Sequence, residues 1–507
     1  MMMTHETTLN EIDWLKRWGH YSPKAIALTD GDSGAQLSYG DFYKQACAGA
    51  FYLKNTLGIK PGDRVIHFST NEVSSFVLFF ALSRIGATLV PINYRLTARE
   101  ITYVINDAAP SLIVYEDQFL PVLQSVKNDI HVNEKNWMSI KNDTATCFEA
   151  ITKRPEQFAE FLSKPDSIGL IIYTSGTTGF PKGAMISHSM LFWNSINTSM
   201  RLNVCQSDAA VTFLPLFHTG GWNVLSTPFL HRGAHIVLIK KFDGDQILAL
   251  SEKHKTTLLF GVPTTMKMMS NSKNFATVDL SSVRYGIVGG EPMPLEEIRT
   301  WGKKQISIRQ GYGLTECGPN IFSLNEEDAV RKMGSIGFPN FYVDVQVVND
   351  LGEKCGPKEV GELWLKGPMT MAGYWNNEKA TAETFSDGWF KTGDLVYFDP
   401  EGYFYVVGRK KDMYKSGGEN VYPVEVEKVL SEVPWVHEVA VVGVKDPQWG
   451  EVGHAYLAVK AGQTFDQASL VEHCQANLAK FKIPKFFTEL KELPKGDSGK
   501  ILKRLLN

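Results

Sequence analysis

One stretch of the chain concentrates glycine, hydroxyl residues and a lysine within eleven positions. These are Tyr173-Thr174-Ser175-Gly176-Thr177-Thr178-Gly179-Phe180-Pro181-Lys182-Gly183, between an apolar run and an expected helix near Ser189. Glycines let backbone N–H groups converge on an anion, and the hydroxyls and Lys182 add donors. The stretch therefore predicts a phosphate-binding loop, although composition alone would also fit an ordinary turn. It is not a Walker A loop, because that spacing requires a glycine at Pro181 and a hydroxyl residue at Gly183.

Four further motifs follow this loop along the chain. They are Gly311-Tyr312-Gly313-Leu314-Thr315-Glu316, Thr392-Gly393-Asp394, Gly408-Arg409-Lys410-Lys411-Asp412 and Pro494-Lys495-Gly496-Asp497-Ser498-Gly499-Lys500. Together with the loop, the set resembles the signature of the adenylate-forming superfamily, which includes acyl-CoA synthetases, nonribosomal adenylation domains and beetle luciferases. The resemblance runs nearly end to end. It implies an AMP-forming ligase that joins a carboxylic acid to AMP, releases diphosphate, and passes the acyl group to coenzyme A.

The resemblance assigns the charged part of ATP to three places. The loop from Thr174 to Lys182, with Ser175, Gly176, Thr177, Thr178 and Gly179, would hold the β- and γ-phosphates. Thr315 would contact the α-phosphate and Glu316 would bind Mg²⁺, an ion that suits a carboxylate together with phosphate oxygens. Adenylation brings two anions together, so cations and oriented N–H groups at these positions would lower its barrier.

The nucleoside part of ATP is assigned by the same resemblance. Tyr312, between Gly311 and Gly313, would lie against the adenine, since a planar purine suits an aromatic face. Gly289-Gly290-Glu291 would contact the other side of the ring, and Asp394 with Arg409 would bind the ribose hydroxyls. Taken singly, each residue also fits a plain structural role, as a core aromatic, a cap or a surface ion pair.

The C-terminal motifs imply a two-step reaction with a domain rotation. In the resemblance, Lys500 bridges the substrate carboxylate and the α-phosphate during adenylation, a task that suits a mobile point charge. Lys411 marks the hinge about which the C-terminal domain turns between half-reactions. Ser416, Gly417 and Gly418 then line the tunnel for the pantetheine arm of coenzyme A. A solvated tail lysine and an ordinary turn are the plain alternatives for Lys500 and for the glycine pair.

The acyl-binding pocket is expected around Phe217-His218-Thr219-Gly220-Gly221-Trp222. The resemblance places His218 near the substrate carboxylate, which is already ionised and needs no general base. In the family that the chain resembles, adenylation domains for amino acids usually place an aspartate in this pocket to pair with the ammonium. No acidic residue stands between 217 and 225, so free amino acids are disfavoured. The candidate lining is largely apolar and favours a medium- or long-chain fatty acid, with an aromatic acid as the alternative: Trp222, Val224, Val262, Gly290, Leu314 and Cys317.

Three other functions share parts of this pattern. An acyl-AMP ligase would load a carrier protein in place of free coenzyme A, but the chain has no attached carrier domain and no obvious insertion before the hinge. A luciferase-like oxygenase shares the adenylation step, although no residue separately indicates oxygen chemistry. A non-catalytic nucleotide-binding protein is disfavoured because every motif residue with a catalytic role is present.

The elements expected to position these residues belong to an α/β fold. Short apolar runs alternate with amphipathic ones, starting with strands at 64–68, 88–92 and 112–115 and helices at 73–84 and 98–106. The alternation predicts doubly wound parallel sheets, whose ligands gather at the carboxyl ends of the strands. Strands at 168–174, 209–214, 235–239, 257–260 and 284–288 continue the pattern.

Beyond about Gly334 the pattern changes to short strands and turns, which predicts a small β-barrel-like subdomain. A compact α+β domain follows, with a helix at 423–431, strands at 438–444 and 454–459, and a helix at 467–479, and the resemblance implies that this domain is mobile. We expect an N-terminal AMP-binding domain at 1–408, a hinge at 409–412 and a C-terminal domain at 413–507.

Composition excludes several classes of protein. The net charge is only −3, with 52 basic and 55 acidic residues, so no overall field favours nucleic acid as a partner. The six cysteines are dispersed, which suits reduced thiols in the cytoplasm, and neither they nor His231 and His235 form a metal motif. No apolar run approaches the length of a membrane span. The expected partners are the acid, ATP and coenzyme A, and the sequence is compatible with a homodimer without predicting one.

Overall fold

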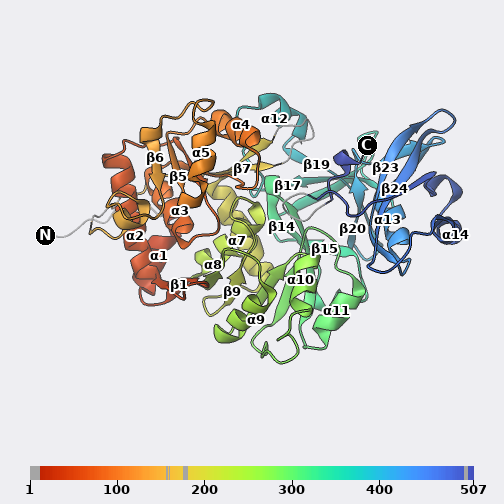
Figure 1. Cartoon of the computed structure of the whole chain (residues 1–507), viewed down its shortest axis with the longest axis horizontal. Helices are drawn as coiled ribbons and strands as arrows, with labels where there is room; N and C mark the ends of the chain where they lie inside the picture. The colour runs from red at the N-terminus through yellow and green to blue at the C-terminus, as the bar shows by residue number, and fades with distance from the viewer. Residues whose placement is uncertain (1–11, 156–157, 159, 175–180, 496–500, 507) are drawn as a thin grey trace. The chain divides into compact units, whose positions relative to one another are not determined.

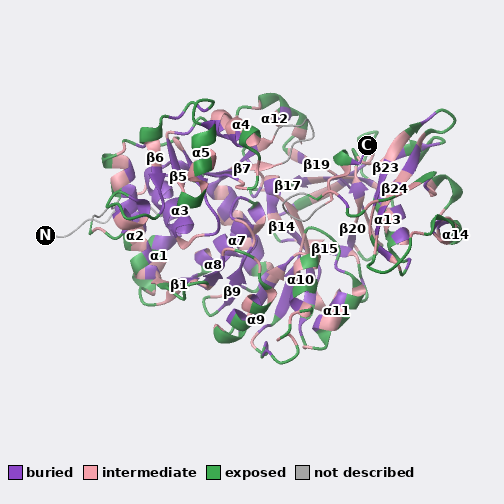
Figure 2. Cartoon of the chain, viewed as in Figure 1, coloured by how far each residue is buried: buried purple, intermediate pink, exposed green. Residues whose placement is uncertain are grey.

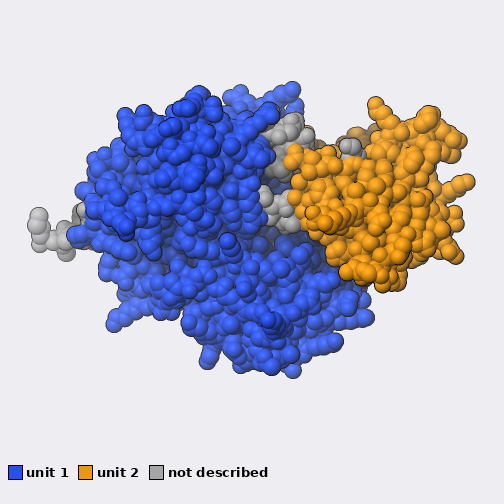
Figure 3. Space-filling model, viewed as in Figure 1, with its two compact units in different colours: residues 1–344, 366–390 blue, residues 345–365, 391–507 orange. Residues whose placement is uncertain are grey.

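The computed structural model describes residues 12–155, 158, 160–174, 181–495 and 501–506. The chain forms two compact units (Figure 3): unit 1 comprises residues 1–344 and 366–390, and unit 2 comprises residues 345–365 and 391–507. Helices and strands alternate through most of unit 1 (Figure 1). Among the described residues, no helix is both long and apolar enough to cross a membrane.

The first sheet of unit 1 has the strand order β6-β5-β3-β4-β7-β8, in which all neighbours are parallel except β7 and β8. The strands are β3 (Arg64–Phe68), β4 (Thr88–Pro91), β5 (Leu112–Tyr115), β6 (Trp137–Ser139), β7 (Ile168–Thr174) and β8 (Lys182–Ser187). The associated helices are α2 (Tyr39–Asn55), α3 (Val73–Ile85), α4 (Ala98–Ala108), α5 (Leu120–Val126) and α6 (Phe148–Thr152). Helix α3 is apolar on nearly every side because it packs against α2 and against strands β4 and β7, so all its residues after Val73 are buried.

The second sheet of unit 1 has the order β2-β1-β10-β9. Its strands are β1 (Ile26–Asp30), β2 (Gln36–Ser38), β9 (Ala209–Thr212) and β10 (His235–Leu238). A third group of strands has the order β11-β12-β13-β14-β15, with parallel pairing up to β13 and antiparallel pairing after it. These strands are β11 (Leu258–Gly261), β12 (Tyr285–Val288), β13 (Ser307–Leu314), β14 (Gly318–Ser323) and β15 (Ser335–Pro339).

Unit 1 contains further helices. They are α1 (Trp14–Tyr21), α7 (His188–Leu202), α8 (Ser226–Arg232), α9 (Gly244–Lys253), α10 (Pro263–Ser270), α11 (Leu295–Gly302) and α12 (Glu378–Thr384), with a π-helix η3 at Gly220–Val224 and a 3-10 turn η4 at Thr315–Cys317. Buried residues gather on the strands and on the helix faces that cover them (Figure 2). One core cluster joins β3, β5, α4 and α5, and another joins β10 to β13 with α9, α10 and α11.

Unit 2 contains two groups of strands. The first has the order β20-β19-β17-β16 and comprises β16 (Asp344–Val348), β17 (Gly361–Lys366), β19 (Trp389–Phe398) and β20 (Phe404–Arg409). The second has the order β22-β21-β24-β23, with β25 paired to β24, and comprises β21 (Tyr414–Ser416), β22 (Glu419–Val421), β23 (Val436–Asp446), β24 (Gly450–Val459) and β25 (Phe486–Glu489). Helices α13 (Pro423–Ser431) and α14 (Gln467–Asn477) pack with this second group around an apolar core.

The structure confirms the mixed α/β class with a large N-terminal part and a smaller C-terminal one. The helix expected near Ser189 is α7, which begins at His188, and the unforeseen strand β8 lies between it and the phosphate loop and pairs antiparallel with β7. The predicted boundaries at 408 and 413 stay a prediction, and the compact units place β16, β17 and β20 with the C-terminal strands.

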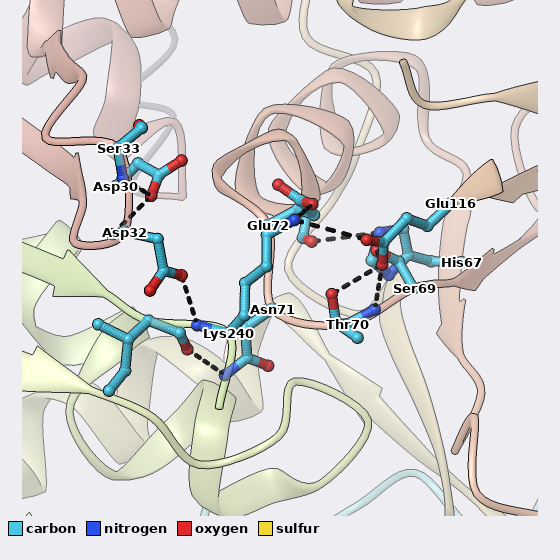
Figure 4. A network of polar contacts seen from close by, with 12 residues as sticks. Asp30, Asp32, Ser33, His67, Ser69, Thr70, Asn71, Glu72, Glu116 and Lys240 are labelled. Atoms are coloured by element: carbon cyan, nitrogen blue, oxygen red, sulfur yellow. Dashed lines mark hydrogen bonds and ion pairs between the residues drawn. The ribbon is translucent and has the colours of Figure 1, made fainter. Parts of the chain in front are cut away.

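Lys240 joins the first two sheets of unit 1 through polar contacts (Figure 4). It follows β10, and its ammonium bonds to Glu72, which precedes α3, and lies 3.5 Å from Glu116 Oε1 after β5. Glu116 Oε2 also accepts hydrogen bonds from the backbone N–H and the hydroxyl of Thr70, at 3.0 and 2.7 Å. One cation thus serves two carboxylates at the carboxyl ends of neighbouring strands.

Replacing Lys240 by methionine is expected to lower the free energy of unfolding at neutral pH by about 1–2 kcal/mol, between typical values for exposed and buried ion pairs. Burial raises the pKa of Glu72 despite its bond to Lys240, so the charged carboxylate costs stability above that pKa. Losing Lys240 enlarges this cost, and protonation of Glu72 removes it. The difference from wild type should therefore shrink as the pH falls, in urea unfolding followed at neutral and mildly acidic pH. Lys241→Met, at an exposed neighbour, is the control, and a pH-independent difference would contradict the interpretation.

Candidate active site

The carboxyl ends of β11, β12 and β13 form one edge of the sheet, where the predicted adenine-binding segments begin. Gly261 pairs with Val288, and Val288 with Gln310, so Val262, Gly289 and Gly311 stand in a row across this edge. A side chain at Gly289 would meet the carbonyl of Gly311, 3.8 Å from its Cβ. The structure therefore brings together the predicted contacts for both sides of the adenine ring on neighbouring strands.

Strand β13 changes direction where the predicted α-phosphate and metal residues stand. Tyr312 is half-buried and its ring meets that of Phe322 edge to face at 5.8 Å. Gly313 cannot carry a side chain, because a Cβ there would lie 2.3 Å from the backbone of Pro319. This close approach lets the chain turn through η4 and places Thr315, which is buried, and Glu316, which is half-buried, beside the end of β13.

Lys182 and Glu316 contact the same tyrosine. The hydroxyl of Tyr374 donates a hydrogen bond to Glu316 Oε1 at 2.9 Å, and Lys182 Nζ lies 5.3 Å from the centre of the Tyr374 ring. Lys182 begins β8, which pairs with β7 at Thr174. Sequence reasoning missed Tyr374, since no charge or spacing distinguished Gly373-Tyr374-Trp375 from an ordinary apolar turn.

Several predicted site residues lie outside the described part of the chain. They are Ser175, Gly176, Thr177, Thr178, Gly179 and Lys500. The described residues at the two ends of the phosphate loop are a strand pair, because Thr174 stands opposite Lys182. The loop is therefore closed at its base by the β7–β8 ladder, and its phosphate contacts stay a prediction.

His218 lies just before the π-helix η3 and is hydrogen-bonded to its first residue. Its side chain is accessible to solvent, yet protein atoms crowd around it and the resulting desolvation lowers its pKa. Its Nδ1 accepts a hydrogen bond from the backbone N–H of Gly220 at 3.2 Å, for which this nitrogen must be deprotonated. The ring is therefore neutral at neutral pH and can donate from Nε2.

The π-helix after His218 is held by buried amides. Asn320 on β14 donates to the carbonyls of Asn223 and Val224 at 3.2 and 3.1 Å, and Asn194 on α7 donates to the carbonyl of Asn223 at 2.8 Å. Single π-turns often occur at functional sites because they displace the local backbone. Helix α7 and strand β14 thus fix the segment expected to open the acyl pocket.

The predicted lining of the acyl pocket separates into two sets. Trp222 is fully buried, with its ring edge-on to Phe76 at 5.0 Å and its indole N–H bonded to a carbonyl, and Cys317 is equally buried. Val224 is also buried. The accessible members are Val262, Gly290 and Leu314. The first set belongs to the core behind the segment, and the lining role of all six stays a prediction.

Unit 2 holds the predicted ribose-binding pair. Asp394 on β19 stands opposite Arg409 on β20, and Arg409 Nε lies 2.6 Å from Asp394 Oδ1. The Asp394 side chain is buried, whereas the Arg409 side chain is 42% exposed. Lys411, two residues after Arg409, is exposed, as the predicted hinge residue should be.

The predicted pantetheine loop is the tip of a hairpin in unit 2. Strands β21 and β22 are joined by Gly417 and Gly418, whose φ angles of 62° and 89° lie in the left-handed region. Buried Ser416 pairs with Gly450 on β24, and Gly417 donates its N–H to the carbonyl of Trp449 at 2.9 Å. The half-exposed Trp449 ring covers one side of the turn, so backbone and aromatic ring meet at an accessible surface.

Comparison with known proteins identifies the family. The AMP-binding enzyme family matches residues 15–375, and the C-terminal domain of AMP-binding enzymes matches residues 425–500. The chain belongs to this family and is an AMP-forming acid–thiol ligase of the adenylate-forming superfamily.

Relatives of this family align over almost the whole chain. It is 35% identical to a feruloyl-CoA synthase of Amycolatopsis and 34% identical to a long-chain-fatty-acid–CoA ligase of Mycobacterium tuberculosis, covering 97% and 98% of both chains respectively. The structure of o-succinylbenzoate CoA synthetase from Bacillus subtilis with its acyl-adenylate superimposes with a TM-score of 0.88, at 29% identity and 98% coverage of both chains. The same synthetase with ATP and a magnesium ion gives a TM-score of 0.86, at 28% identity and 97% and 99% coverage.

Proposed function

We propose that the protein activates an apolar carboxylic acid with ATP and Mg²⁺ and transfers the acyl group to coenzyme A. In the first step a carboxylate oxygen attacks the α-phosphorus and diphosphate leaves. In the second step the thiolate of coenzyme A attacks the acyl carbonyl carbon and AMP leaves. The observation that carries the proposal is the contact of both Lys182 and Glu316 with Tyr374, which supports a phosphate-binding role for the cation and a metal-binding role for the carboxylate.

The proposed residue roles follow the motifs. The phosphate loop with Lys182 would hold the β- and γ-phosphates, Thr315 the α-phosphate and Glu316 the Mg²⁺ ion. Tyr312 and the 289–291 segment would hold the adenine. His218, neutral and able to donate, would hydrogen-bond an oxygen of the acid. Mg²⁺ would neutralise phosphate charge when bound, and it also occupies the Bacillus subtilis relative.

The proposed acid is a medium- or long-chain fatty acid. The accessible candidate lining of Val262, Gly290 and Leu314 is apolar, and no acidic residue between 217 and 225 could bind an ammonium. A buried methylene contributes only about 0.8 kcal/mol, so several neighbouring chain lengths should be accepted. The similarity to feruloyl-CoA synthase favours an aromatic acid as the second candidate.

A panel of acids distinguishes these two candidates. We would compare kcat/KM for straight-chain acids of increasing length with that for cinnamic, hydroxycinnamic and indoleacetic acids at saturating ATP and coenzyme A. A fatty acid ligase should show kcat/KM rising with chain length to a broad optimum and poor use of the aromatic acids. The reverse order would replace the fatty acid by an aromatic one without affecting the ligase assignment.

Substituting Gly417 by alanine is expected to impair the second step alone. An alanine at φ 62° costs about 1–2 kcal/mol, and its Cβ would lie 3.1 Å from the Trp449 ring, so either the ring or the hairpin tip must give way. Displacing a positioning loop lowers a rate by about tenfold or more. Acyl transfer from preformed acyl-AMP should fall by that factor, whereas acid-dependent diphosphate exchange should stay within about twofold of wild type.

Gly462→Ala is the matched control for this prediction. Gly462 also belongs to unit 2 and has a φ of 76°, but an added Cβ would meet nothing within 4 Å. It should show a similar loss of stability without the loss of transfer. Equal rates of acyl transfer in the two variants would contradict the proposed role of the hairpin in binding pantetheine.

We also propose that free coenzyme A is the acceptor and that the protein acts in the cytoplasm. An acyl-AMP ligase acting on a carrier protein would form acyl-AMP but no acyl-CoA, which distinguishes it from the proposed enzyme. The cytoplasm is proposed from the six dispersed cysteines, all of which are free thiols.

A further inference from the structure

Tyr374 stands on a segment that links the phosphate loop to the turn carrying Glu316. The backbone around it runs antiparallel to β8, with Ala372 N–H donating to Met185, Trp375 N–H donating to Gly183, and a bridge between Tyr374 and Ala184. One residue earlier in the same segment, the N–H of Met371 donates to the carbonyl of Glu316 at 2.7 Å. The segment is therefore bonded at one end to β8 and at the other to η4.

The side chain of Tyr374 also contacts both of these segments, β8 through Lys182 and η4 through Glu316. Its hydroxyl donates to Glu316 Oε1 at 2.9 Å, while its ring lies 5.3 Å from Lys182 Nζ. Its backbone N–H donates to the hydroxyl of Thr381 at 2.9 Å, and this bond helps to fix the backbone at Tyr374. Burial, and then the nearby Glu316 carboxylate, raise the pKa of Tyr374, so the phenol keeps its hydroxyl proton at neutral pH.

We propose that Tyr374 is a positioning residue for Mg²⁺-dependent ATP binding, which holds the Glu316 carboxylate through its hydroxyl and the Lys182 ammonium over its ring. The inference rests on the proposed function and deepens it. The hydrogen bond at Oε1 orients the Glu316 carboxylate, a group with about four acceptor positions in all. The ring face attracts the Lys182 ammonium and limits its freedom.

The two contacts are separable by substitution. Tyr374→Phe removes the hydroxyl and keeps the ring, and Tyr374→Leu removes both. A hydrogen bond to a charged group has a free energy that corresponds to about a tenfold or larger change in affinity. An exposed cation–π contact corresponds to about a two- to fivefold change. The hydroxyl should therefore control the metal dependence, and the ring should control the affinity for the phosphates themselves.

The test measures ATP binding calorimetrically, without acid or coenzyme A, in excess EDTA and across a MgCl₂ titration. Tyr374→Phe is expected to raise the Mg²⁺ concentration at half-effect by about tenfold and to leave metal-free ATP affinity unchanged. Tyr374→Leu should in addition weaken metal-free ATP binding by about two- to fivefold. In a Glu316→Gln background, Tyr374→Phe should have less than a twofold further effect, because the group through which it acts has been changed.

Tyr39→Phe is the control for a purely structural role. The Tyr39 hydroxyl is buried and donates to the carbonyl of Ala234 at 2.6 Å, so its loss removes a comparable hydrogen bond elsewhere in unit 1. It should lower stability without moving the Mg²⁺ dependence. An unchanged Mg²⁺ titration in Tyr374→Phe, or an equal shift in the Glu316→Gln background, would overturn the inference while leaving the ligase intact. Wild-type protein that binds no ATP at any Mg²⁺ concentration would overturn the proposed function and the inference together.

Discussion

Lys500→Ala is expected to lower the rate of acyl-AMP formation by about 10²–10³-fold, the usual effect of removing one contact that stabilises a transition state. By resemblance, this lysine bridges the attacking carboxylate and the α-phosphate only during adenylation. Transfer of the acyl group from preformed acyl-AMP to coenzyme A should therefore remain within a fewfold of wild type. Diphosphate release and thioester formation, each followed in single-turnover experiments, measure the two steps separately.

Lys495→Ala is the matched control within the same motif. Lys495 carries the same charge five residues earlier, but its ammonium bonds to Glu438 on β23. Its loss should affect stability slightly and neither half-reaction substantially. If Lys500→Ala slowed both half-reactions equally, the division of labour between two conformations would be contradicted.

Asp394→Asn is expected to raise the KM for ATP by about 10–100-fold, because the buried carboxylate both orients Arg409 and would accept the ribose hydroxyls. The asparagine keeps the shape but loses the charge that faces the guanidinium, 2.6 Å away. The effect should appear mainly in KM, since the ribose contacts are similar in the ground state and the transition state. Steady-state kinetics with ATP varied at saturating acid and coenzyme A provide the measurement.

The same hairpin supplies the control for Asp394. Asp399 lies just beyond β19 and its carboxylate accepts the N–H groups of Glu401 and Tyr403 in the turn. Asp399→Asn should weaken the turn but leave the KM for ATP near the wild-type value. Equal increases in KM for both variants would indicate that Asp394 acts by folding the hairpin rather than by binding ribose.

The strands and helices with simple periodicity could be predicted from the sequence. The expected strand at Arg64–Phe68 and the expected helix at Pro423–Ser431 have the observed bounds. Both are short amphipathic or apolar runs closed by turn residues, so local pattern and tertiary burial agree. Helix α3 could also be predicted, since an apolar run of this length must lie in a core or a membrane.

Contacts between distant segments could not be predicted in this way. Strand β8 contains Lys182, Gly183 and Ala184, which have weak strand preference, and it is a strand because it pairs with β7. Tyr374 meets Lys182 and Glu316 only through that pairing and the segment bonded beside it. The burial of Trp222 depends likewise on Phe76 in α3, which is distant in sequence. Sequence motifs thus indicate the candidate binding and catalytic residues, whereas the residues that position them depend on long-range packing.

In the most direct test of the central claim, the purified protein is incubated with ATP, Mg²⁺ and a fatty or aromatic acid, with and without coenzyme A. The acyl products are then identified by mass spectrometry. The ligase predicts acyl-AMP without coenzyme A, and stoichiometric AMP and acyl-CoA when coenzyme A is added. Acyl-AMP that persists unchanged in the presence of coenzyme A would contradict the proposed acceptor, and the absence of any acyl-AMP would contradict the enzyme itself.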